Sequence, residues 1–400
     1  MSTAVATATR GRAISSRHAG WAGIALGIVA WFIALPPALV RTPAPSVVIG
    51  VMAIGAGAWA LGGGERKLGW GAIVAGVVGA GGAVASTKSG VGNLKDVVTW
   101  SALVAATLRY ATPLIFGALG GIVSERSGIV NVGLEGMMLM GAFFGIYGAD
   151  VFDSWFLGLL VGMLAGGVLA FVHAFFSIQL RADQVVSGIA LNFIAVGMTG
   201  YIFLNHYGDQ GTPDNIPRIP DVTLPGIKNI GFVGDAIGKA NLLTWVALIG
   251  VVLLSVFLFR TAQGLRLRSV GEHPRAAETV GISVTRTRYV AVVASGMLAA
   301  MGGAYLSIGF VGSFNQNMTA GRGFIALAAM IFGNWRPFGA FGAALLFGFS
   351  TALAYRLPAY SGSAATLFQA LPYVLTLIAV AGVVGRTVPP AADGKPYKKQ

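Results

Sequence analysis

The stretch GLRLRSVGEHPRAAETVGISVTRTRY, residues 264–289, is the longest polar interruption near the middle of a mostly apolar chain. It contains five arginines and two glutamates: Arg266, Arg268, Arg275, Arg286, Arg288, Glu272 and Glu278. Proline is tolerated in a first helical turn, which favours a helix start at Pro274. Gly281 is suited to end that helix in the left-handed conformation. The pattern predicts a short basic helix from Pro274 to Val280 between two apolar segments.

The composition of the whole chain is that of a membrane protein. Of its 400 residues, 55% are hydrophobic and only 10% are charged, against roughly 25% charged in soluble domains. The mean hydropathy is +0.75, and the apolar runs approach the ~20 residues that a membrane helix needs. A membrane β-barrel would instead show segments of ~10 residues with alternating polarity. We therefore predict an all-α polytopic membrane protein.

Twelve apolar stretches are predicted as membrane spans. They are residues 19–40, 45–64, 68–87, 98–122, 129–149, 154–178, 185–206, 241–260, 289–309, 321–335, 337–357 and 366–385. The first follows three arginines and resembles a signal peptide, but its length and the eleven later spans favour a retained anchor. The tenth is short, which is typical of either a broken or a re-entrant helix.

The basic residues predict the orientation of these spans. With a cytoplasmic N-terminus, the cytoplasmic segments hold 18 of the 27 lysines and arginines, the outer segments hold eight, and Arg109 lies inside a span. Basic residues collect in cytoplasmic loops. We therefore expect both termini and residues 264–289 in the cytoplasm, and we interpret the net charge of +13 in this way rather than as a nucleic-acid site.

Three regions are expected along the chain. Residues 1–95 form an N-terminal extension of about three plain spans, residues 96–386 form the core, and residues 387–400 form a cytoplasmic tail that we expect to be disordered. The outer loop at residues 207–240 is rich in proline and glycine, which predicts irregular structure. It is either a simple connector or a docking surface for an extracytoplasmic partner.

The sequence lacks the motifs of several enzyme classes. No G-x-x-x-x-G-K-[ST], H-E-x-x-H or G-x-S-x-G occurs, so neither a P-loop nor a zinc-protease or serine-hydrolase site is predicted. There is no cysteine, and the four histidines do not have metal-ligand spacing. We predict no catalytic residue and no bound metal or cofactor. Few carboxylates lie deep in the spans, which argues against coupling to protons.

Polar residues inside the spans are the candidates for a translocation path. Asn131 and Glu135 are spaced i, i+4, which predicts one helical face. Gln184 and Asn192, two turns apart, are expected to share a face with Ser187. Burying such groups in a membrane helix is costly unless they are paired or line a wet path. Hydrogen bonding between helices and a role in the path are both open interpretations.

A third polar group is the run NQNMTAGRGFIALA, which begins at residue 315. We expect its polar side chains at the outer edge of a short span, in a vestibule: Asn315, Gln316, Asn317 and Arg322. The basic helix of residues 274–280 has two interpretations as well. It is either a rigid contact for another protein or an interfacial helix on anionic lipid.

Several long runs resemble one protein family. GEHPRAAETVGI (271–282) resembles the coupling-helix segment of ABC importer permeases of the branched-chain amino acid, ribose and nucleoside class. Four further runs resemble the nucleoside and simple-sugar branch: SERSGIVNVGLEGMMLMGAF (124–143), QVVSGIALN (184–192), NQNMTAGRGFIALAAMIFGNWRPFGAFGAALLFG (315–348) and FQALPYVLTLI (368–378). The resemblance extends from about Thr99 to Gly385, and residues 1–95 lie outside it.

The resemblance implies a type II ABC importer permease core with extra N-terminal helices. It implies a separate ABC ATPase that binds ATP and Mg²⁺, a second permease that is a different chain, and an extracytoplasmic substrate-binding lipoprotein at a bacterial cell membrane. ATPase coupling then falls on the segment around residues 272–282: Gly271, Glu272, Pro274, Arg275, Ala277 and Gly281. Nucleosides, purines and simple sugars are all possible substrates. The alternative is a stand-alone secondary transporter or channel for small polar solutes.

Overall fold

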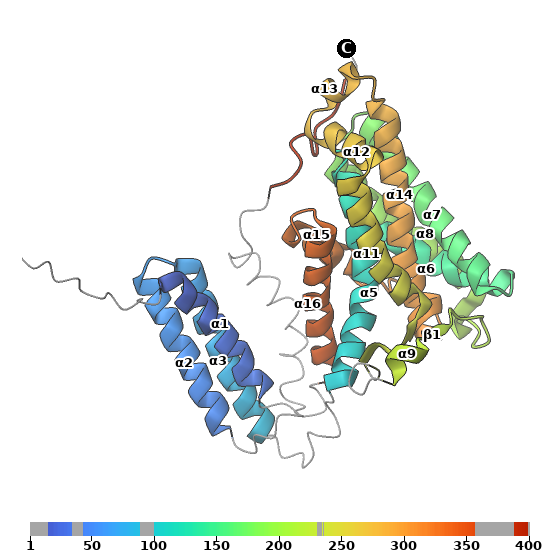
Figure 1. Cartoon of the computed structure of the whole chain (residues 1–400). Helices are drawn as coiled ribbons and strands as arrows, with labels where there is room; N and C mark the ends of the chain where they lie inside the picture. Colours follow the sequence, from blue (N-terminus) through green and yellow to red (C-terminus); the bar gives the residue numbers. More distant parts are fainter. Residues whose placement is uncertain are drawn as a thin grey trace, which may run out of the picture. The chain divides into compact units, whose positions relative to one another are not determined.

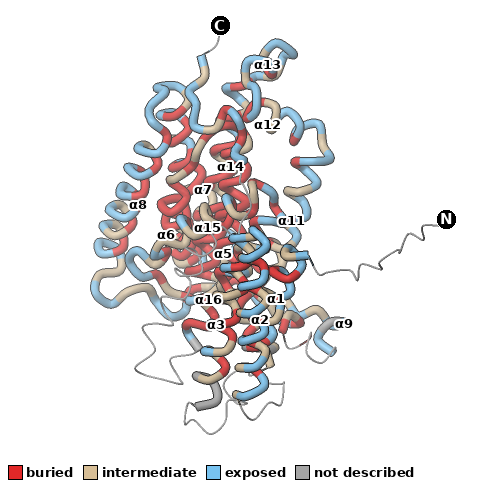
Figure 2. The backbone as a smooth tube through the Cα atoms, turned by 90° about the vertical axis from the view of Figure 1, so that its left-hand side faces the viewer, coloured by how far each residue is buried: buried red, intermediate tan, exposed pale blue. Residues whose placement is uncertain are grey.

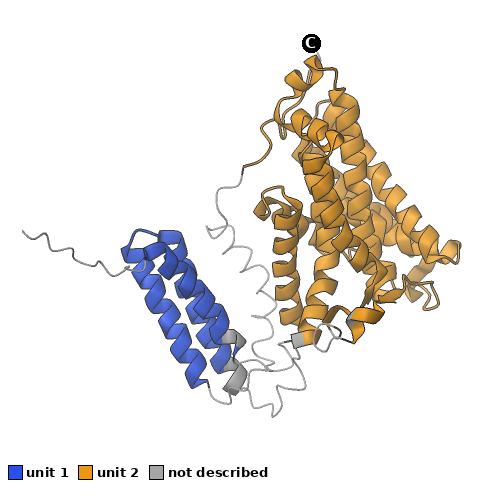
Figure 3. Ribbon diagram, in the orientation of Figure 1, with its two compact units in different colours: residues 1–100, 356–368, 380–383 blue, residues 101–355, 369–379, 384–400 orange. Residues whose placement is uncertain are grey.

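The computed structural model describes residues 15–33, 43–88, 100–229, 234, 236–356 and 388–398. The described part is almost entirely helical, as predicted (Figure 1). Contacts divide it into two compact units, α1–α3 and the remainder from α5 onward (Figure 3). The predicted domain boundary between residues 95 and 96 lies outside the described residues and stays a prediction.

The first unit is a bundle of three helices, α1 (Ser16–Phe32), α2 (Ala44–Gly62) and α3 (Arg66–Lys88). The buried face of α2 carries only small residues, at intervals of three and four: Ser46, Gly50, Ala53, Gly57 and Ala60. A Cβ atom added at Gly27 would lie 2.4 Å from the backbone carbon of Ala75. Small residues therefore let the three backbones approach closely, as is common in membrane helices.

The second unit contains the remaining helices. They are α5 (Trp100–Glu125), α6 (Leu134–Val151), α7 (Trp155–Ala174), α8 (Gln184–Tyr207), α9 (Pro225–Lys228), α11 (Leu242–Arg260), α12 (Ala262–Glu272), α13 (Pro274–Thr279), α14 (Val284–Ala304), α15 (Arg322–Phe332) and α16 (Pro337–Arg356). Short π-helical turns extend α7 at Phe175–Gln179 and α14 at Tyr305–Val311, and a 3-10 turn follows α8 at Gly208–Gln210. Two strands, β1 (Asp221–Thr223) and β2 (Lys239–Asn241), pair antiparallel with Asp221 opposite Asn241.

The core of the second unit lies where α6, α7 and α14 meet (Figure 2). Glycines set the spacing: a Cβ atom at Gly141 would lie 2.2 Å from the carbonyl oxygen of Ala300, and one at Gly158 would lie 2.5 Å from that of Gly145. Small residues on α6 and α7 therefore let these helices pack closely. Large apolar side chains on α8 and α11 point outward, Phe193 being 73% exposed, as expected of helices in contact with lipid or another subunit.

Eight helices of the described part are long and apolar enough to cross a membrane. The helices α1, α6 and α15 are not among them, and the predicted span at 366–385 lies outside the described residues. The prediction of helix from residue 129 was wrong, since α6 begins at Leu134. The tenth predicted span is the 11-residue helix α15.

Candidate functional site

The polar residues predicted around Asn131 meet at a break between α5 and α6. Residues 126–133 are not helical although they are mostly buried. Irregular backbone inside a membrane protein is tolerated only where other groups satisfy its N–H and C=O. The backbone N–H and C=O groups of residues 126–133 therefore need hydrogen-bond partners from elsewhere in the unit.

Side chains of α7 and α8 supply most of these hydrogen bonds. The Val130 N–H donates to Gln184 Oε1 (2.7 Å), and the Val130 carbonyl accepts from His173 Nε2 (2.9 Å). Asn192 Nδ2 donates to the Val132 carbonyl (3.0 Å), and its Oδ1 accepts from the Gly136 N–H (2.8 Å). Gln184 and Asn192 do share one face of α8, as predicted. In this structure that face holds the α5–α6 turn together.

Asn131 lies within the turn itself and not on α6. The predicted i, i+4 helical face with Glu135 is therefore wrong, because the helix starts three residues later. Asn131 is fully buried, and its Nδ2 donates to Ser295 Oγ on α14 (3.0 Å). Its buried Oδ1 has no hydrogen-bond partner within the described part of the chain.

Glu135 connects the first turn of α6 to the start of α15. Its Oε1 accepts from the Gly321 N–H (2.8 Å) and its Oε2 from the Gly323 N–H (2.6 Å). Gly321 has a φ of +83°, which glycine adopts without strain. The carboxylate therefore lies at the N-terminus of α15, where the helix dipole favours a negative charge.

The polar run before α15 penetrates further into the unit than predicted. The Phe314 ring lies 5.1 Å from that of Phe143 in the middle of α6. Gly321 contacts Glu135 in the first turn of α6. Glu135 and Phe143 are about 12 Å apart along the helix, at 1.5 Å per residue. Arg322 is therefore not at the outer edge, where we expected it. Its Nη1 donates to the carbonyls of Met318 and Thr319 (3.0 Å each).

The three amide side chains of that run point away from the core. Asn315, Gln316 and Asn317 are all exposed, and Asn317 has a φ of +55°. The structure does not bring them together with Asn131, Gln184 or Asn192. They form an open polar surface on the second unit.

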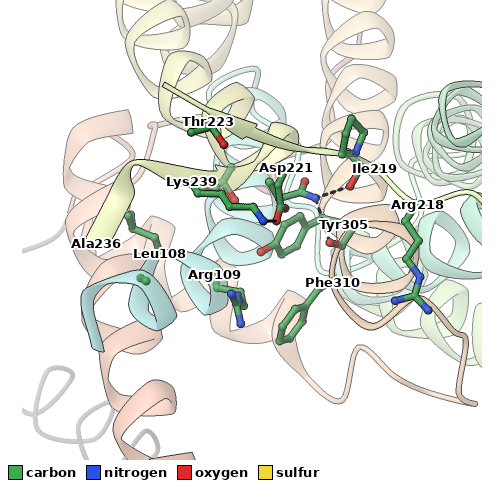
Figure 4. A pocket seen from close by; sticks show the side chains of 16 residues that line it. Leu108, Arg109, Arg218, Ile219, Asp221, Thr223, Ala236, Lys239, Tyr305 and Phe310 are labelled. Atoms are coloured by element: carbon green, nitrogen blue, oxygen red, sulfur yellow. Dashed lines mark hydrogen bonds and ion pairs between the residues drawn. The ribbon is translucent and has the colours of Figure 1, made fainter. Parts of the chain in front are cut away.

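A cavity of about 770 Å³ lies at the β1–β2 end of the second unit (Figure 4). Its lining combines the start of α5, the two strands, the start of α11 and the π-helical turn after α14. Asn241 fixes this arrangement, because its Nδ2 donates to the carbonyls of Ile219 (3.0 Å) and Gly309 (3.1 Å). The predicted irregular loop at 207–240 thus contains a short paired hairpin that forms one wall.

The charges of this cavity are mainly positive. Lys239 Nζ lies 3.6 Å from Asp221 Oδ2, and the Arg109 guanidinium lies 5.5 Å from the centre of the Phe310 ring. Arg218 also lines the cavity. Three cations and one carboxylate disfavour a cationic solute and favour a neutral or anionic one. The sequence signal for this site was Arg109, the basic residue inside a predicted span.

At the opposite end, α12 and α13 lie at the tip of the second unit (Figure 1). The predicted helix is confirmed to within one residue, and Gly281 ends it with a φ of +83°. Val280 at its end is 74% exposed. The outward face of this tip carries Arg275 and Ala276.

Two residues assigned to a coupling surface are in fact internal. Ala277 is 3% exposed and packs against Val270 and Val284. Gly271 is buried, and a Cβ atom there would lie 2.2 Å from the Arg126 carbonyl oxygen. Both residues pack against the rest of the unit and do not face outward. Ala277 lies on the side of α13 that faces the protein, and Gly271 lies on α12 against the backbone of Arg126.

The C-terminal tail was predicted to be disordered, and this was wrong for residues 388–398. The Ala392 N–H donates to the Gly271 carbonyl (2.9 Å). Arg288 Nη1 donates to the Lys395 carbonyl (3.4 Å), and the Tyr397 hydroxyl donates to Glu278. The polar composition of the tail suggested disorder. The tail is ordered because its backbone forms hydrogen bonds with buried groups elsewhere in the chain, such as Arg288 and the Gly271 carbonyl.

A cluster of ionisable groups lies beneath this tail. Arg288, counted from sequence among cytoplasmic loop residues, is 1% exposed, and its Nε donates to the Ser127 carbonyl (3.1 Å). Glu125 accepts from Trp335 Nε1 (2.6 Å) and lies against Asp393. Burial raises the pKa of Asp393 to about 7, although its contacts with Glu125, the Gly394 backbone and the Arg288 charge oppose the rise.

The described residues contain no group of three or more His, Asp or Glu side chains placed to hold a metal ion. The polar residues described above form hydrogen bonds with the backbone, line the cavity or lie on the protein surface. His173 Nδ1 lies 3.1 Å from Ser187 Oγ, and the same ring contacts the Val130 carbonyl through Nε2. The arrangement is suited to passage and to contact with other proteins.

Comparison with known proteins gives consistent matches. Residues 103–380 match the family model described as the branched-chain amino acid transport system permease component. The chain is 42% identical to the guanosine ABC transporter permease protein NupQ of Bacillus subtilis, over 75% of this chain and 97% of that one. It is 41% identical to the nucleoside ABC transporter permease protein NupC of Lactococcus lactis, over 76% and 98%.

More distant relatives also match. The putative glucose ABC transporter permease protein TsgC13 of Haloferax volcanii is 38% identical over 64% of this chain and 77% of its own length. The L. lactis strain that has NupC also has the nucleoside permease protein NupB, 27% identical over 61% of this chain and 70% of its own length. No solved structure gives a significant match.

Proposed function

The chain belongs to the branched-chain amino acid transport system permease family, and from this premise we propose that it is the permease subunit of an ATP-driven importer of nucleosides or related small polar solutes. It is a multi-pass membrane protein of a transport family.

The observation that carries the proposal is the tip formed by α12 and α13. Membrane loops seldom need a rigid helix that projects beyond the spans, and α13 presents Arg275 and the 74%-exposed Val280 outward. An exposed apolar residue beside a cation is suited to a groove in a partner protein. We propose that this partner is the ABC ATPase, which binds ATP and Mg²⁺ and moves the tip through Glu272–Gly281.

Nucleosides are the substrates that best fit the chemistry. They are neutral and rich in hydroxyl and amide groups, which suit uncharged polar side chains. The cavity at the β1–β2 end has an excess of cations, which do not repel a neutral solute, and the uncharged hydroxyl residue Thr223 is among those that line it. NupQ and NupC, which are both more than 40% identical to this chain, are named for guanosine and for nucleosides. TsgC13 is named for glucose, so a simple sugar is the second candidate substrate.

We further propose a second permease subunit and an outer binding protein. The exposed amides Asn315–Asn317 would be covered by the second permease, so that a path lined by polar groups lies between two chains. The presence of two unlike nucleoside permeases in one organism supports a different chain in this role. The wall formed by β1 and β2 is the proposed contact for a substrate-binding lipoprotein.

The proposed location is a bacterial cell membrane with both termini in the cytoplasm. The count made from the sequence, 18 basic residues in the segments predicted to be cytoplasmic against eight in those predicted to be outside, supports this orientation. In that arrangement α13 faces the compartment that contains ATP.

The role of the tip is tested by replacing Val280 with aspartate in the co-expressed transporter. Desolvating a new carboxylate in a docking groove is costly, so we expect recovery of the ATPase and guanosine uptake both to fall about tenfold or more. Ala277→Trp is not a suitable test, because Ala277 is buried and a larger side chain there would disturb the fold of the tip.

The matched control is Val151→Asp, an exposed valine (53%) at the other end of the unit. It should leave both quantities unchanged. Normal ATPase recovery and normal uptake in Val280→Asp would contradict coupling through α13. Uptake by the isolated chain, driven by an ion gradient, would favour the stand-alone transporter.

A further inference from the structure

Residues 388–398 lie against the tip of the second unit and contact α12 and α13 directly. The Ala391 N–H donates to Glu272 Oε2 (3.1 Å), and the Ala392 N–H donates to the Gly271 carbonyl (2.9 Å). Further along, the Tyr397 hydroxyl donates to Glu278 on α13, and Tyr397 packs against the Val270–Ala277–Val284 cluster. The tail and α13 therefore form one continuous structure.

The tail is also anchored below this contact. Ala392 is 6% exposed, and Asp393 lies against Glu125 at the end of α5. Arg288 at the start of α14 donates to the Lys395 carbonyl. The Val388 N–H donates to Asn334 Oδ1 in the turn between α15 and α16 (3.0 Å). A segment held at both ends is a fixed part of the surface that a partner meets.

The contacts leave a surface with an excess of positive charge. Both glutamates of the 264–289 segment are used within the chain, since Glu278 accepts from Tyr397 and Glu272 accepts from the tail backbone and lies 3.9 Å from Arg126. A groove of about 730 Å³ runs between α13 and the tail. Four cations and one half-exposed carboxylate line it: Arg181, Arg275, Lys395, Lys398 and Glu272.

We propose that residues 388–398 form, together with α13, a composite docking surface for the ATPase subunit, and that the ATPase presents acidic side chains to the groove between them. The proposal rests on the function proposed above. The position of the groove favours a protein over lipid headgroups, because α13 and the tail lie at the tip of the unit beyond α12 (Figure 1). The exposed Val280 at the C-terminal end of α13 also suits a protein partner.

The test is a double charge reversal in the tail, Lys395→Glu with Lys398→Glu, in the full co-expressed transporter in nanodiscs. Like charges across an interface weaken binding, so the affinity of the ATPase should fall about tenfold, and wild-type affinity should fall with rising salt. Lys228→Glu, an exposed lysine at the β1–β2 end, is the control and should bind normally. A stop codon after residue 387 should weaken binding at least as much.

The outcomes separate the two proposals. If the wild-type chain binds no ATPase, the proposed function fails. If it does, and the double variant binds within twofold of wild type, the composite surface is wrong while the function stands. If instead the variant loses only its affinity for vesicles of anionic lipid, the groove is a headgroup site and the proposal is overturned.

Discussion

At the scale of single residues, Glu135 has the most demanding environment. It is 6% exposed, and both carboxylate oxygens accept backbone N–H groups at the start of α15. Of the two interpretations left open from the sequence, these contacts favour hydrogen bonding between helices, because Glu135 holds the start of α15 in place. Glu135 therefore fixes the position of the turn at Gly321 and Arg322. We expect it to influence the substrate path only indirectly, by holding this turn in place.

Replacing Glu135 with alanine is predicted to destabilise the second unit by about 3 kcal/mol, because two buried N–H groups lose charged acceptors. Glu135→Gln keeps one acceptor oxygen and should have an intermediate effect. Thermal unfolding in detergent measures both variants against Asp209→Ala, which removes an exposed carboxylate. Equal melting temperatures for Glu135→Ala and Asp209→Ala would contradict the assignment.

Asp393 makes attachment of the tail dependent on pH. Because burial raises the pKa of Asp393 from 3.8 to about 7, the docked tail binds a proton that the free tail releases near pH 4. The contribution of Asp393 to docking is therefore most favourable below about pH 4, weakens as pH rises toward 7, and changes no further above that. The groups facing Asp393 are Glu125, Arg288 and the Gly394 backbone.

Hydrogen exchange of the peptide 388–398 measures this effect. After correction for intrinsic rates, we expect greater protection at pH 5.5 than at pH 8. The variant Asp393→Asn is neutral at both pH values, so it should reduce the difference in protection between them. Any difference that remains is assigned to titration of Glu125. Protection that is equal at the two pH values, or greater at pH 8, would refute the assignment.

At the scale of elements, the sequence predicts the helices well and the breaks poorly. Apolar runs and Gly281 locate α13 and most spans, because length and capping are local properties. A break between spans was predicted at residues 123–128, but its extension to residue 133 was not, since the groups that satisfy residues 130–132 come from Gln184, His173 and Asn192 on other helices.

The candidate site was predicted in part for the same reason. Gln184, Asn192 and Glu135 were identified as unusual polar residues in apolar helices, and the structure brings them to one region around the α5–α6 turn. Whether a polar side chain binds backbone or lines a path depends on its neighbours in space. The order of the tail likewise depends on buried partners, Arg288 and Glu125, that no local pattern reveals.

At the scale of the whole molecule, the second unit has two chemically distinct ends. One holds a polar cavity of about 770 Å³ enclosed by β1, β2 and Asn241, and the other holds a basic tip made of α13 and the tail. A buried core of α6, α7 and α14 separates them. This division fits a subunit that receives solute at one end and force from a partner at the other.

The most direct test of this account is guanosine uptake by the purified complex in proteoliposomes. With ATP on the α13 side and no ion gradient, we predict uptake that stops when ATP is replaced by a non-hydrolysable analogue or when the ATPase is omitted. Uptake that persists without ATP hydrolysis and collapses when an ion gradient is dissipated would contradict the central claim and identify a secondary transporter.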